Sequence, residues 1–280
     1  MNLQSAMPCS ISGPLEPSLI EAYRRDGIVK LKLPRHLDDR RSQLIEEIRI
    51  WLGAVAGIRS AARELPQRLS DMARANRPLL GKLYKLSRRL PSARRMASDN
   101  WFIDVAAQTM KTRLVSCCTF VNLRFDLPHE ERFLTPIHQD FPYIQGSLNG
   151  ITIWLPLFDT PVELGPPEWI AGSHRWGVLK VREFNLEQVN SSGAKSFELA
   201  RQPEIAREST FTTAAVAAGE ALLFSTLLVH RSSVNATGLA RVNIQIRFDD
   251  ALAPESIERN YPEGLYLGST FSTAYPEYVE

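Results

Sequence analysis

The second part of the chain alternates short apolar runs with turn-forming residues. From about residue 112, runs rich in β-branched and aromatic residues are separated by Gly, Pro, Asn and Asp, a pattern typical of strands joined by turns. In the run from Arg241 to Phe248, four polar residues alternate with four apolar ones, so one face of this strand should be polar and the other apolar. The predicted strands are residues 113–125, 151–157, 168–170, 220–225, 228–232 and 241–248.

The first 110 residues have a different periodicity and are predicted to be mainly helical. Residues 17–25 and 37–56 carry apolar residues at helical spacing, and residues 28–33 between them alternate as a strand. We see no regular exchange of strands and helices, which argues against a parallel nucleotide-binding sheet. The pattern therefore predicts a helical N-terminal segment followed by a β-sandwich or barrel. We expect one domain over residues 1–280, with a helical segment at 1–110, a β core at 111–250 carrying an insertion or lid at 178–210, and a tail at 251–280.

Residues 59–95 are strongly basic. They hold eleven Arg or Lys against Glu64 and Asp71, and prolines 66, 78 and 91 should divide them into short helices. Such a stretch is commonly a set of solvated helix faces. It could also bind an acidic partner, such as a carrier protein, a phosphorylated substrate or a CoA-type thioester. Nucleic acid is less favoured, because Tyr84 is the one aromatic residue in the segment.

Composition narrows the protein class only modestly. The chain has 280 residues, 44% hydrophobic and 23% charged, with a net charge of +2, all ordinary for a globular protein. Three cysteines do not make a disulfide framework, and we expect Cys117 and Cys118 to be small, buried apolar residues. The first twenty residues lack the features of a signal peptide, and no run is long enough to span a membrane. A reducing, cytoplasmic location is the expectation.

Two histidines and a carboxylate form the candidate metal site. His138 and Asp140 are two apart, which on a strand places both side chains on one face, and His230 lies in a later apolar strand. Two histidines and one carboxylate are the ligand set of non-haem Fe(II) sites that leave metal positions open for chemistry. Arg241 opens the next strand and, if buried, needs a carboxylate partner. The distal carboxylate of 2-oxoglutarate is the candidate. A lone histidine in an apolar strand is more commonly a hydrogen-bonded core residue. The prediction of a metal site therefore depends on His138, Asp140, His230 and Arg241 occurring together.

The motifs TPIHQDFPYIQGS, ITIWLPL, GSH at 172–174 and HRSSVNATGLAR together resemble the phytanoyl-CoA dioxygenase family of Fe(II)/2-oxoglutarate oxygenases. The resemblance covers residues 18–33 and 113–249, but not the basic segment or the tail. It implies a double-stranded β-helix, a cupin-like jelly roll, with the helical segment packed outside the barrel. It also implies hydroxylation or desaturation of a small-molecule metabolite by O₂, with release of succinate and CO₂ and with ascorbate as an in vitro reductant.

The resemblance assigns roles to individual residues. It implies His138, Asp140 and His230 as iron ligands and Arg241 as the anchor of the distal 2-oxoglutarate carboxylate. Further contacts to the co-substrate are implied for Ser232, Trp154, Asn122 and Arg124. In halogenases related to the family Gly or Ala replaces the aspartate, so Asp140 indicates oxygenation. His174 is implied to be structural or at the pocket rim.

Substrate recognition is the least determined aspect. Phe141, Tyr143 and Gln145 directly follow the metal motif and are candidates for substrate contact, with core packing as the alternative. The aromatic tail could cap the pocket or pack on the barrel. Two other functions remain open: a non-catalytic cupin-like protein that binds 2-oxoglutarate, and an oxygenase whose carrier- or CoA-tethered substrate docks on residues 59–95.

Overall fold

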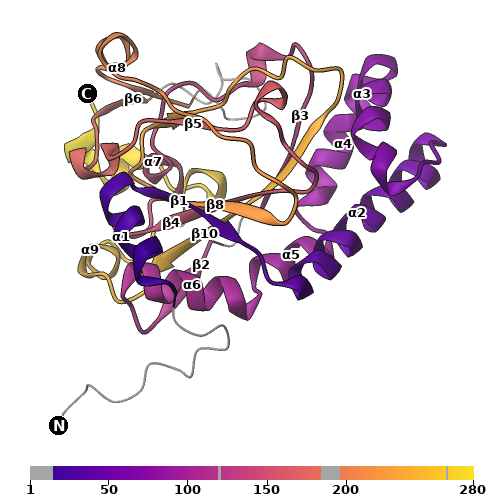
Figure 1. The fold of residues 1–280 in the computed structure, drawn as a ribbon. Helices are drawn as coiled ribbons and strands as arrows, with labels where there is room; N and C mark the ends of the chain where they lie inside the picture. Colours follow the sequence, from indigo (N-terminus) through magenta and orange to yellow (C-terminus); the bar gives the residue numbers. More distant parts are fainter. Residues whose placement is uncertain (1–14, 119–120, 184–195, 263) are drawn as a thin grey trace.

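A computed structural model describes residues 15–118, 121–183, 196–262 and 264–280. Its centre is a six-stranded antiparallel sheet (Figure 1). The order along it is β1, β8, β4 and β10, and both β2 and β3 pair with β10. The strands are β1 (Ile28–Lys32), β2 (Val115–Cys117), β3 (Asn122–Asp126), β4 (Ile151–Pro156), β8 (Glu220–Ser225) and β10 (Arg241–Asp250).

The two faces of this sheet have different chemistry. On β10, Val242, Ile244, Ile246 and Phe248 belong to the large apolar core that the sheet shares with the N-terminal helices. The intervening polar residues of β10 point to the opposite face, as the alternation in the sequence predicts. Register places Arg241 opposite Asp126 of β3, and Arg247 opposite Thr152 of β4. One face thus carries most of the packing, and the other carries the polar groups.

Short strand segments form a second layer facing the polar side. Strand β5 (Glu168–Trp169) pairs with β9 (His230–Arg231), and isolated bridges add His138 to His230 and Thr212 to Trp169. Two facing antiparallel layers are the architecture of a jelly roll. A separate hairpin of β6 (Val181–Glu183) and β7 (Phe197–Leu199) follows.

The N-terminal helices pack on the apolar face of the large sheet; α2 to α6 lie along the right and lower sides of Figure 1, and α1 lies at its left. Prolines stand at the first or second position of α3, α4 and α5, as predicted from the sequence, because a helix start tolerates the missing N–H. The helices are α1 (Pro17–Asp26), α2 (Arg35–Ala56), α3 (Leu65–Ala75), α4 (Arg77–Ser87), α5 (Pro91–Ala97) and α6 (Asn100–Met110).

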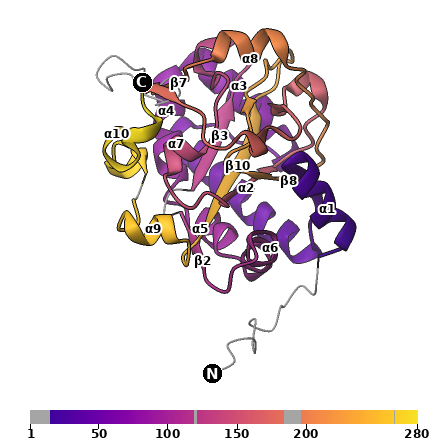
Figure 2. The ribbon, with the colours of Figure 1, turned by 90° about the vertical axis from the view of Figure 1, so that its left-hand side faces the viewer.

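The C-terminal helices α9 (Pro254–Glu258) and α10 (Phe271–Ala274) lie on the side of the molecule opposite α1 (Figure 2). Phe271 and Tyr275 of the tail pack on Phe141 in a second apolar core. Among the described residues, the tail packs on the barrel and does not line the cavity that holds His138, Asp140 and His230. None of the helices in the described stretches of the chain is long and apolar enough to cross a membrane.

Three predictions from the sequence change in detail. Cys117 and Cys118, predicted to be buried, are exposed and half-buried respectively, because β2 lies at the edge of the sheet. Residues 113–125, predicted as one strand, contain two, because β2 and β3 pair with opposite ends of β10. The insertion at 178–210 contains the β6–β7 hairpin and α8 (Gln202–Glu208), while residues 184–195 lie outside the described residues. The described residues of the insertion do not line the cavity that holds His138, Asp140 and His230, so they give no support to a lid.

Candidate active site

His138 and His230 are held side by side by their own backbones. Each backbone N–H donates to the carbonyl oxygen of the other, over 2.9 and 3.0 Å. This two-bond bridge leaves the imidazole centroids 4.1 Å apart. A residue from before β4 and one from β9 thereby project into the same space, although 92 positions separate them in the sequence.

Backbone carbonyls also orient both imidazole rings. His138 Nδ1 lies 2.8 Å from the Pro136 carbonyl oxygen, and His230 Nδ1 lies 2.9 Å from that of Leu228. A carbonyl can only accept, so each Nδ1 carries a proton, and in the neutral ring this leaves the Nε2 lone pair for a metal. Both Nε2 atoms are directed at Asp140 Oδ1, at 3.6 and 3.9 Å. A metal-binding histidine characteristically has its other ring nitrogen fixed in this way.

The two oxygens of Asp140 have different partners. Oδ1 faces the histidines, whereas Oδ2 accepts hydrogen bonds from Thr152 Oγ1 at 2.6 Å and Arg247 Nε at 3.2 Å. One ligand atom from each of His138, Asp140 and His230 lies within 4.8 Å of the others, and all three residues are buried. Oδ1 accepts a hydrogen bond of 3.5 Å from Arg247 Nη2, so it keeps a lone pair for a metal while Oδ2 is anchored more closely to the large sheet.

Protonation states at the triad suit a cation. Burial, followed by the neighbouring His138, lowers the pKa of His230 to about 3, so its ring is neutral at physiological pH. Burial raises the pKa of Asp140, but Arg247 and the two histidines outweigh it and hold that pKa well below the usual range. Neutral imidazole and ionised carboxylate are the forms that bind metals. The donor set and its charge state thus fit Fe(II).

Arg241 is buried beside a carboxylate of the protein itself. Its Nη2 lies 2.9 Å from Asp126 Oδ2, its Nε donates to the same oxygen, and Arg124 Nη2 donates to Asp126 Oδ1 at 2.8 Å. Asp126 is a partner that the sequence did not indicate, because the register of β3 against β10 brings it opposite Arg241. Binding of the 2-oxoglutarate carboxylate by Arg241 stays a prediction. Arg241 Nη1 is buried and makes no hydrogen bond to any described residue. Arg241 lines the cavity, so an anion there would lie beside a guanidinium group that has one unused donor.

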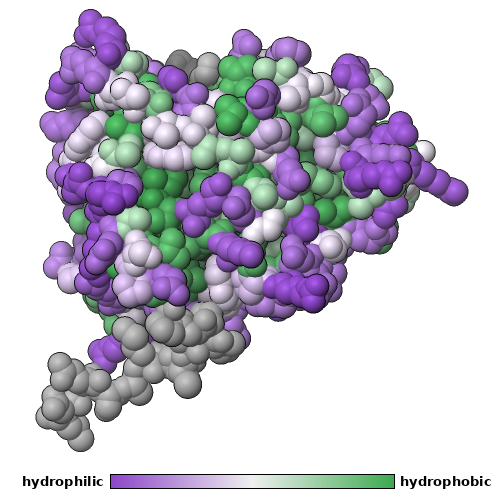
Figure 3. Space-filling view, viewed as in Figure 1, coloured by the Kyte–Doolittle hydropathy of each residue, from purple (hydrophilic) through white to green (hydrophobic). Residues whose placement is uncertain are grey.

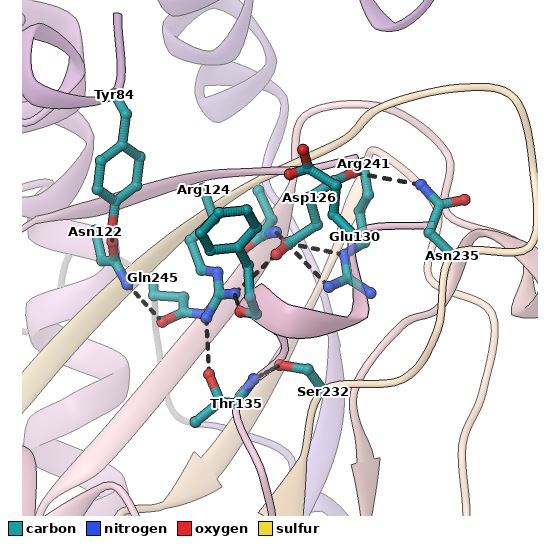
Figure 4. Close-up of polar contacts among 12 residues, drawn as sticks. Tyr84, Asn122, Arg124, Asp126, Glu130, Thr135, Ser232, Asn235, Arg241 and Gln245 are labelled. Carbon is teal, nitrogen blue, oxygen red and sulfur yellow. Dashed lines mark hydrogen bonds and ion pairs between the residues drawn. The ribbon is translucent and has the colours of Figure 1, made fainter. Parts of the chain in front are cut away.

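Figure 4 shows the hydrogen bonds and ion pairs that connect Arg124, Asp126 and Arg241 to their neighbours. Ser232 Oγ accepts from the Thr135 backbone N–H, and the Thr135 hydroxyl accepts from Arg124 Nη1 at 3.0 Å. On the other side, Tyr84 of α4 donates to Asn122, and Asn122 donates to Gln245. Gln245 also accepts from Arg247, so polar contacts link α4 to the group that anchors Asp140.

These groups line a single cavity of about 210 Å³. The cavity contains the three metal-site residues together with Arg241, Ser232, Trp154, Asn122, Arg124 and Tyr143. The structure thus brings together all the predicted metal and co-substrate residues and one of the three predicted substrate residues. Helix α4 adds Arg77, Leu80, Gly81 and Tyr84, so the basic segment contributes one wall.

Two predicted substrate residues lie elsewhere. Phe141 is fully buried among Phe271 and Tyr275, with ring centroids 6.0 and 5.0 Å away. Gln145 is fully buried and donates to the carbonyls of Pro142 and Ser269. The reason is the short helix α7 (Phe141–Ile144) that begins directly after Asp140 and turns both side chains away from the cavity.

Three residues of the site were not singled out from the sequence. Asp126 pairs with Arg241, while Thr152 and Arg247 hold Asp140. Arg247 and Thr152 are polar residues within predicted strands, and this alone could have marked them as candidates. Nothing in the linear sequence showed which partner each would meet, because that depends on strand register.

His174 stands outside the metal site. Its half-buried ring packs near Tyr23 of α1, at 6.4 Å between centroids, and next to Gly27. It belongs to none of the metal-binding groups among the described residues. Its position fits the structural role that the resemblance implies.

The chain matches the model of the phytanoyl-CoA dioxygenase (PhyH) family over residues 52–243. This range includes the basic segment, which the sequence motifs had left outside the resemblance. The 1-deoxypentalenic acid 11-beta-hydroxylases of Streptomyces arenae and Streptomyces exfoliatus are each 26% identical over 132 residues, 47% of this chain and 45% of theirs. The match thus spans about half the length of these curated relatives.

Solved structures show the same fold. The epimerase SnoN, in complex with Fe3+, alpha ketoglutarate and nogalamycin RO, has a TM-score of 0.56 at 19% identity, covering 84% of this chain and 83% of its own. The carbocyclase SnoK from nogalamycin biosynthesis has a TM-score of 0.56 at 18% identity, covering 85% and 87%. EctD from S. alaskensis, with 2-oxoglutarate and 5-hydroxyectoine, has a TM-score of 0.53 at 16% identity, covering 86% and 78%. The predicted jelly roll with a helical N-terminal segment is confirmed.

Proposed function

Because the chain belongs to the phytanoyl-CoA dioxygenase family, we propose that it is an Fe(II)/2-oxoglutarate-dependent oxygenase that hydroxylates or desaturates a small-molecule metabolite. One observation carries the proposal: the cavity that holds His138, Asp140 and His230 also holds Arg241, with a buried unused donor. The names of the relatives agree, since the curated proteins are hydroxylases and several solved neighbours are α-ketoglutarate-dependent.

The triad would hold the iron through the Nε2 atoms of His138 and His230 and through Asp140 Oδ1. Bound there, Fe(II) with 2-oxoglutarate supplies the activation of O₂ that hydroxylation requires. Arg247 and the two histidines keep Asp140 ionised. Thr152 and Arg247 hold Asp140 Oδ2, so that Oδ1 stays directed at the histidines. These contacts set the ligand geometry before any metal arrives.

Arg241 would bind the distal carboxylate of 2-oxoglutarate, with Ser232 and Arg124 beside it. Asp126 accepts from two arginines and so holds both guanidinium groups at the cavity wall. Two guanidinium groups around one carboxylate leave one positive charge for an incoming anion. Trp154, Phe224 and Tyr143 form apolar surface around the triad and exclude water from the reacting atoms.

The direct test is succinate formation from 2-oxoglutarate by purified protein with Fe(II), O₂ and ascorbate. We expect His138→Ala to lose iron binding and turnover, and Arg241→Met to raise the 2-oxoglutarate concentration for half-maximal rate more than tenfold. His174→Ala is the matched control and should retain iron. Unchanged iron binding in His138→Ala would overturn the proposal, and tight 2-oxoglutarate binding without turnover would favour a binding protein.

A tethered substrate is a second candidate, favoured by the position of the basic residues. One face of α4 lines the cavity, while Lys82 and Lys85 on the same helix are exposed, as are Arg89 and Arg94 just beyond. Hydrophilic residues crowd the side of the molecule where α2, α3 and α4 lie (Figure 3). An acidic carrier protein or the nucleotide of a CoA thioester could dock there with its acyl group at the cavity.

Charge reversal distinguishes the two substrate forms. Arg88 stacks on Tyr84 and Arg95 pairs with Glu47, so the informative set is Lys82, Lys85, Arg89 and Arg94 changed to Glu. If docking operates, this variant should raise KM for a tethered substrate at least tenfold and leave KM for its free counterpart within twofold. Equal effects on both would reject docking and leave the oxygenase proposal intact.

A further inference from the structure

The charges that line the cavity almost cancel. Arg77 pairs with Glu130 through two hydrogen bonds of 2.7 and 2.8 Å, and Arg231 pairs with Glu168. Arg247 pairs with Asp140. Every described arginine of the cavity wall thus has a carboxylate of its own, except that Arg124 and Arg241 share Asp126.

The excess positive charge lies at one place, the Arg124–Asp126–Arg241 group. If the proposed function holds, the distal carboxylate of 2-oxoglutarate uses this charge. A substrate entering afterwards finds no guanidinium group without a carboxylate among the described residues of the wall. Because burying a charged group without an opposite charge is costly, we expect the portion of the substrate that packs against this wall to be uncharged.

Gly81 adds a second, independent observation. It lies in the interior of α4, where glycine weakens a helix relative to alanine. Its backbone is not in the left-handed region, and a Cβ built on it meets no atom within 4 Å. Neither backbone conformation nor helix packing therefore demands a glycine here.

The space beside Gly81 belongs to the cavity. Gly81 lines it together with Leu80 and Tyr84 of α4 and with Leu127 and Phe133 of the barrel. The Arg77 guanidinium lies over the Phe133 ring, 4.8 Å from its centroid, so the neutralised Arg77–Glu130 pair closes the edge of this surface. A side chain at position 81 would project into this region.

We propose that Gly81 is a specificity-determining position: it reserves room against α4 for a bulky, uncharged, largely apolar group of the substrate. The inference rests on the proposed function and deepens it, because it names the substrate class. Helix α4 thereby acts as the wall that selects the substrate, while the barrel holds metal and co-substrate.

A pair of rigid probes tests both elements of the proposal. The neutral alcohol 1-adamantanemethanol and the anion 1-adamantanecarboxylate share an apolar cage and differ in charge. Their dissociation constants are measured on the full chain under anaerobic conditions by calorimetric titration, with and without saturating Fe(II) and 2-oxoglutarate. With both bound, the alcohol should bind at least tenfold more tightly than the carboxylate. Without them, the carboxylate should gain affinity, because the Arg124–Asp126–Arg241 group is then available.

Variants of Gly81 give the second readout. Gly81→Leu should weaken binding of the alcohol at least tenfold and Gly81→Ala by a smaller factor, with the affinity for 2-oxoglutarate within twofold of the parent. Gly53→Leu is the matched control, since Gly53 lies inside α2, has no atom closer than 3.9 Å to a built Cβ and does not line the cavity.

Three results would overturn the inference: no alcohol binding to the parent protein, equal or tighter binding of the carboxylate in the loaded state, or unchanged alcohol affinity in Gly81→Leu. Failure of the proposed function is seen separately, as absent binding of Fe(II) or 2-oxoglutarate in the same titrations. The alcohol affinity and its loss in Gly81→Leu remain measurable in that case.

Discussion

Asp140 shows how a single carboxylate is divided between metal binding and the fold. Its Oδ2 is held by Thr152 and Arg247 of the large sheet, and its Oδ1 is left for the histidines. Arg247 is buried with a 6% exposed side chain, and Asp140 with 5%. Removing one partner of a buried ion pair leaves the other charge uncompensated. Arg247 should therefore contribute to the free energy of unfolding even when no metal is bound.

Arg247→Met should therefore destabilise the metal-free protein by about 3–5 kcal/mol, since methionine fills much of the volume but leaves Asp140 without its guanidinium partner. Urea unfolding in the presence of EDTA measures this. Arg182→Met is the control, because the ion pair of Arg182 with Glu280 is more than half exposed at the arginine and should contribute about 1 kcal/mol or less. Equal losses in the two variants would show that Arg247 does not stabilise Asp140.

Asp249 is a second buried carboxylate, and its pKa is raised. It lies beneath Gly146 and Gly150, where a Cβ on either glycine would meet its oxygens, and it accepts a hydrogen bond from the Ser147 backbone N–H at 3.0 Å. Burial raises its pKa to about 7. Below pH 7, Asp249 is therefore mostly protonated in the folded protein, whereas in the unfolded chain it ionises around its ordinary pKa of 3.8.

The sign of the pH dependence follows from this difference. A raised folded-state pKa gives a contribution to stability that is complete below the unfolded value of about 3.8 and is lost as pH rises to about 7. Asp249→Asn cannot ionise and keeps an acceptor for Ser147. It should be more stable than the parent by about 2–4 kcal/mol at pH 8, with the difference shrinking toward pH 4. Urea unfolding across that range measures it, and a pH-independent difference would contradict the prediction.

At the residue scale, the sequence predicted the candidate metal ligands better than it predicted the residues that hydrogen-bond to them. His138, Asp140, His230 and Arg241 follow from spacing and from motifs that resemble a family, and the structure brings them into one cavity. Asp126 could not be assigned to Arg241, because their pairing depends on the register of β3 against β10. Phe141 and Gln145 could not be separated from Tyr143, because the turn into α7 is not visible in hydrophobic periodicity.

At the scale of elements, the long strands were predictable and the short ones were not. Strands β4, β8 and β10 match their predicted runs closely. Strand β10 alternates polar and apolar residues, whereas β4 and β8 are apolar runs that pack into separate apolar clusters on their two faces. The second layer is built from two-residue strands and single bridges, which carry too few residues for a periodic signal. The contact between α1 and the GSH turn also depends on tertiary packing.

Gly27 holds that contact. It ends α1 with φ +76°, and a Cβ there would lie 2.3 Å from His174 Nδ1. Gly27→Ala should therefore cost about 2–4 kcal/mol, from left-handed strain together with the clash. In Gly27→Ala/His174→Ala the clash should disappear, so the double variant should be more stable than the sum of the single losses implies. Thermal or urea unfolding of the four proteins measures the coupling, and strict additivity would show that the ring does not press on Gly27.

At the scale of the whole molecule, the metal site joins the two layers of the jelly roll. His138 and His230 belong to the second layer, the one formed by β5, β9 and the isolated bridges. Asp140 is hydrogen-bonded to Thr152 and Arg247 of the large sheet. A bound metal would therefore connect both layers through one ion. In the unfolded chain the three ligands have no fixed geometry, so the metal should bind the folded state selectively.

This selectivity predicts a stability gain that depends on the triad alone. With Mn(II) as an air-stable substitute for Fe(II), at about one hundred times its dissociation constant, the free energy of unfolding should rise by about 2.7 kcal/mol. Thermal unfolding with and without EDTA measures the gain, and saturating 2-oxoglutarate should increase it further through Arg241. His138→Ala should abolish the gain. His174→Ala should keep it, because His174 lies against α1 and not at the triad. Equal gains in both variants would mean that the metal binds elsewhere and that the two layers are not joined through His138.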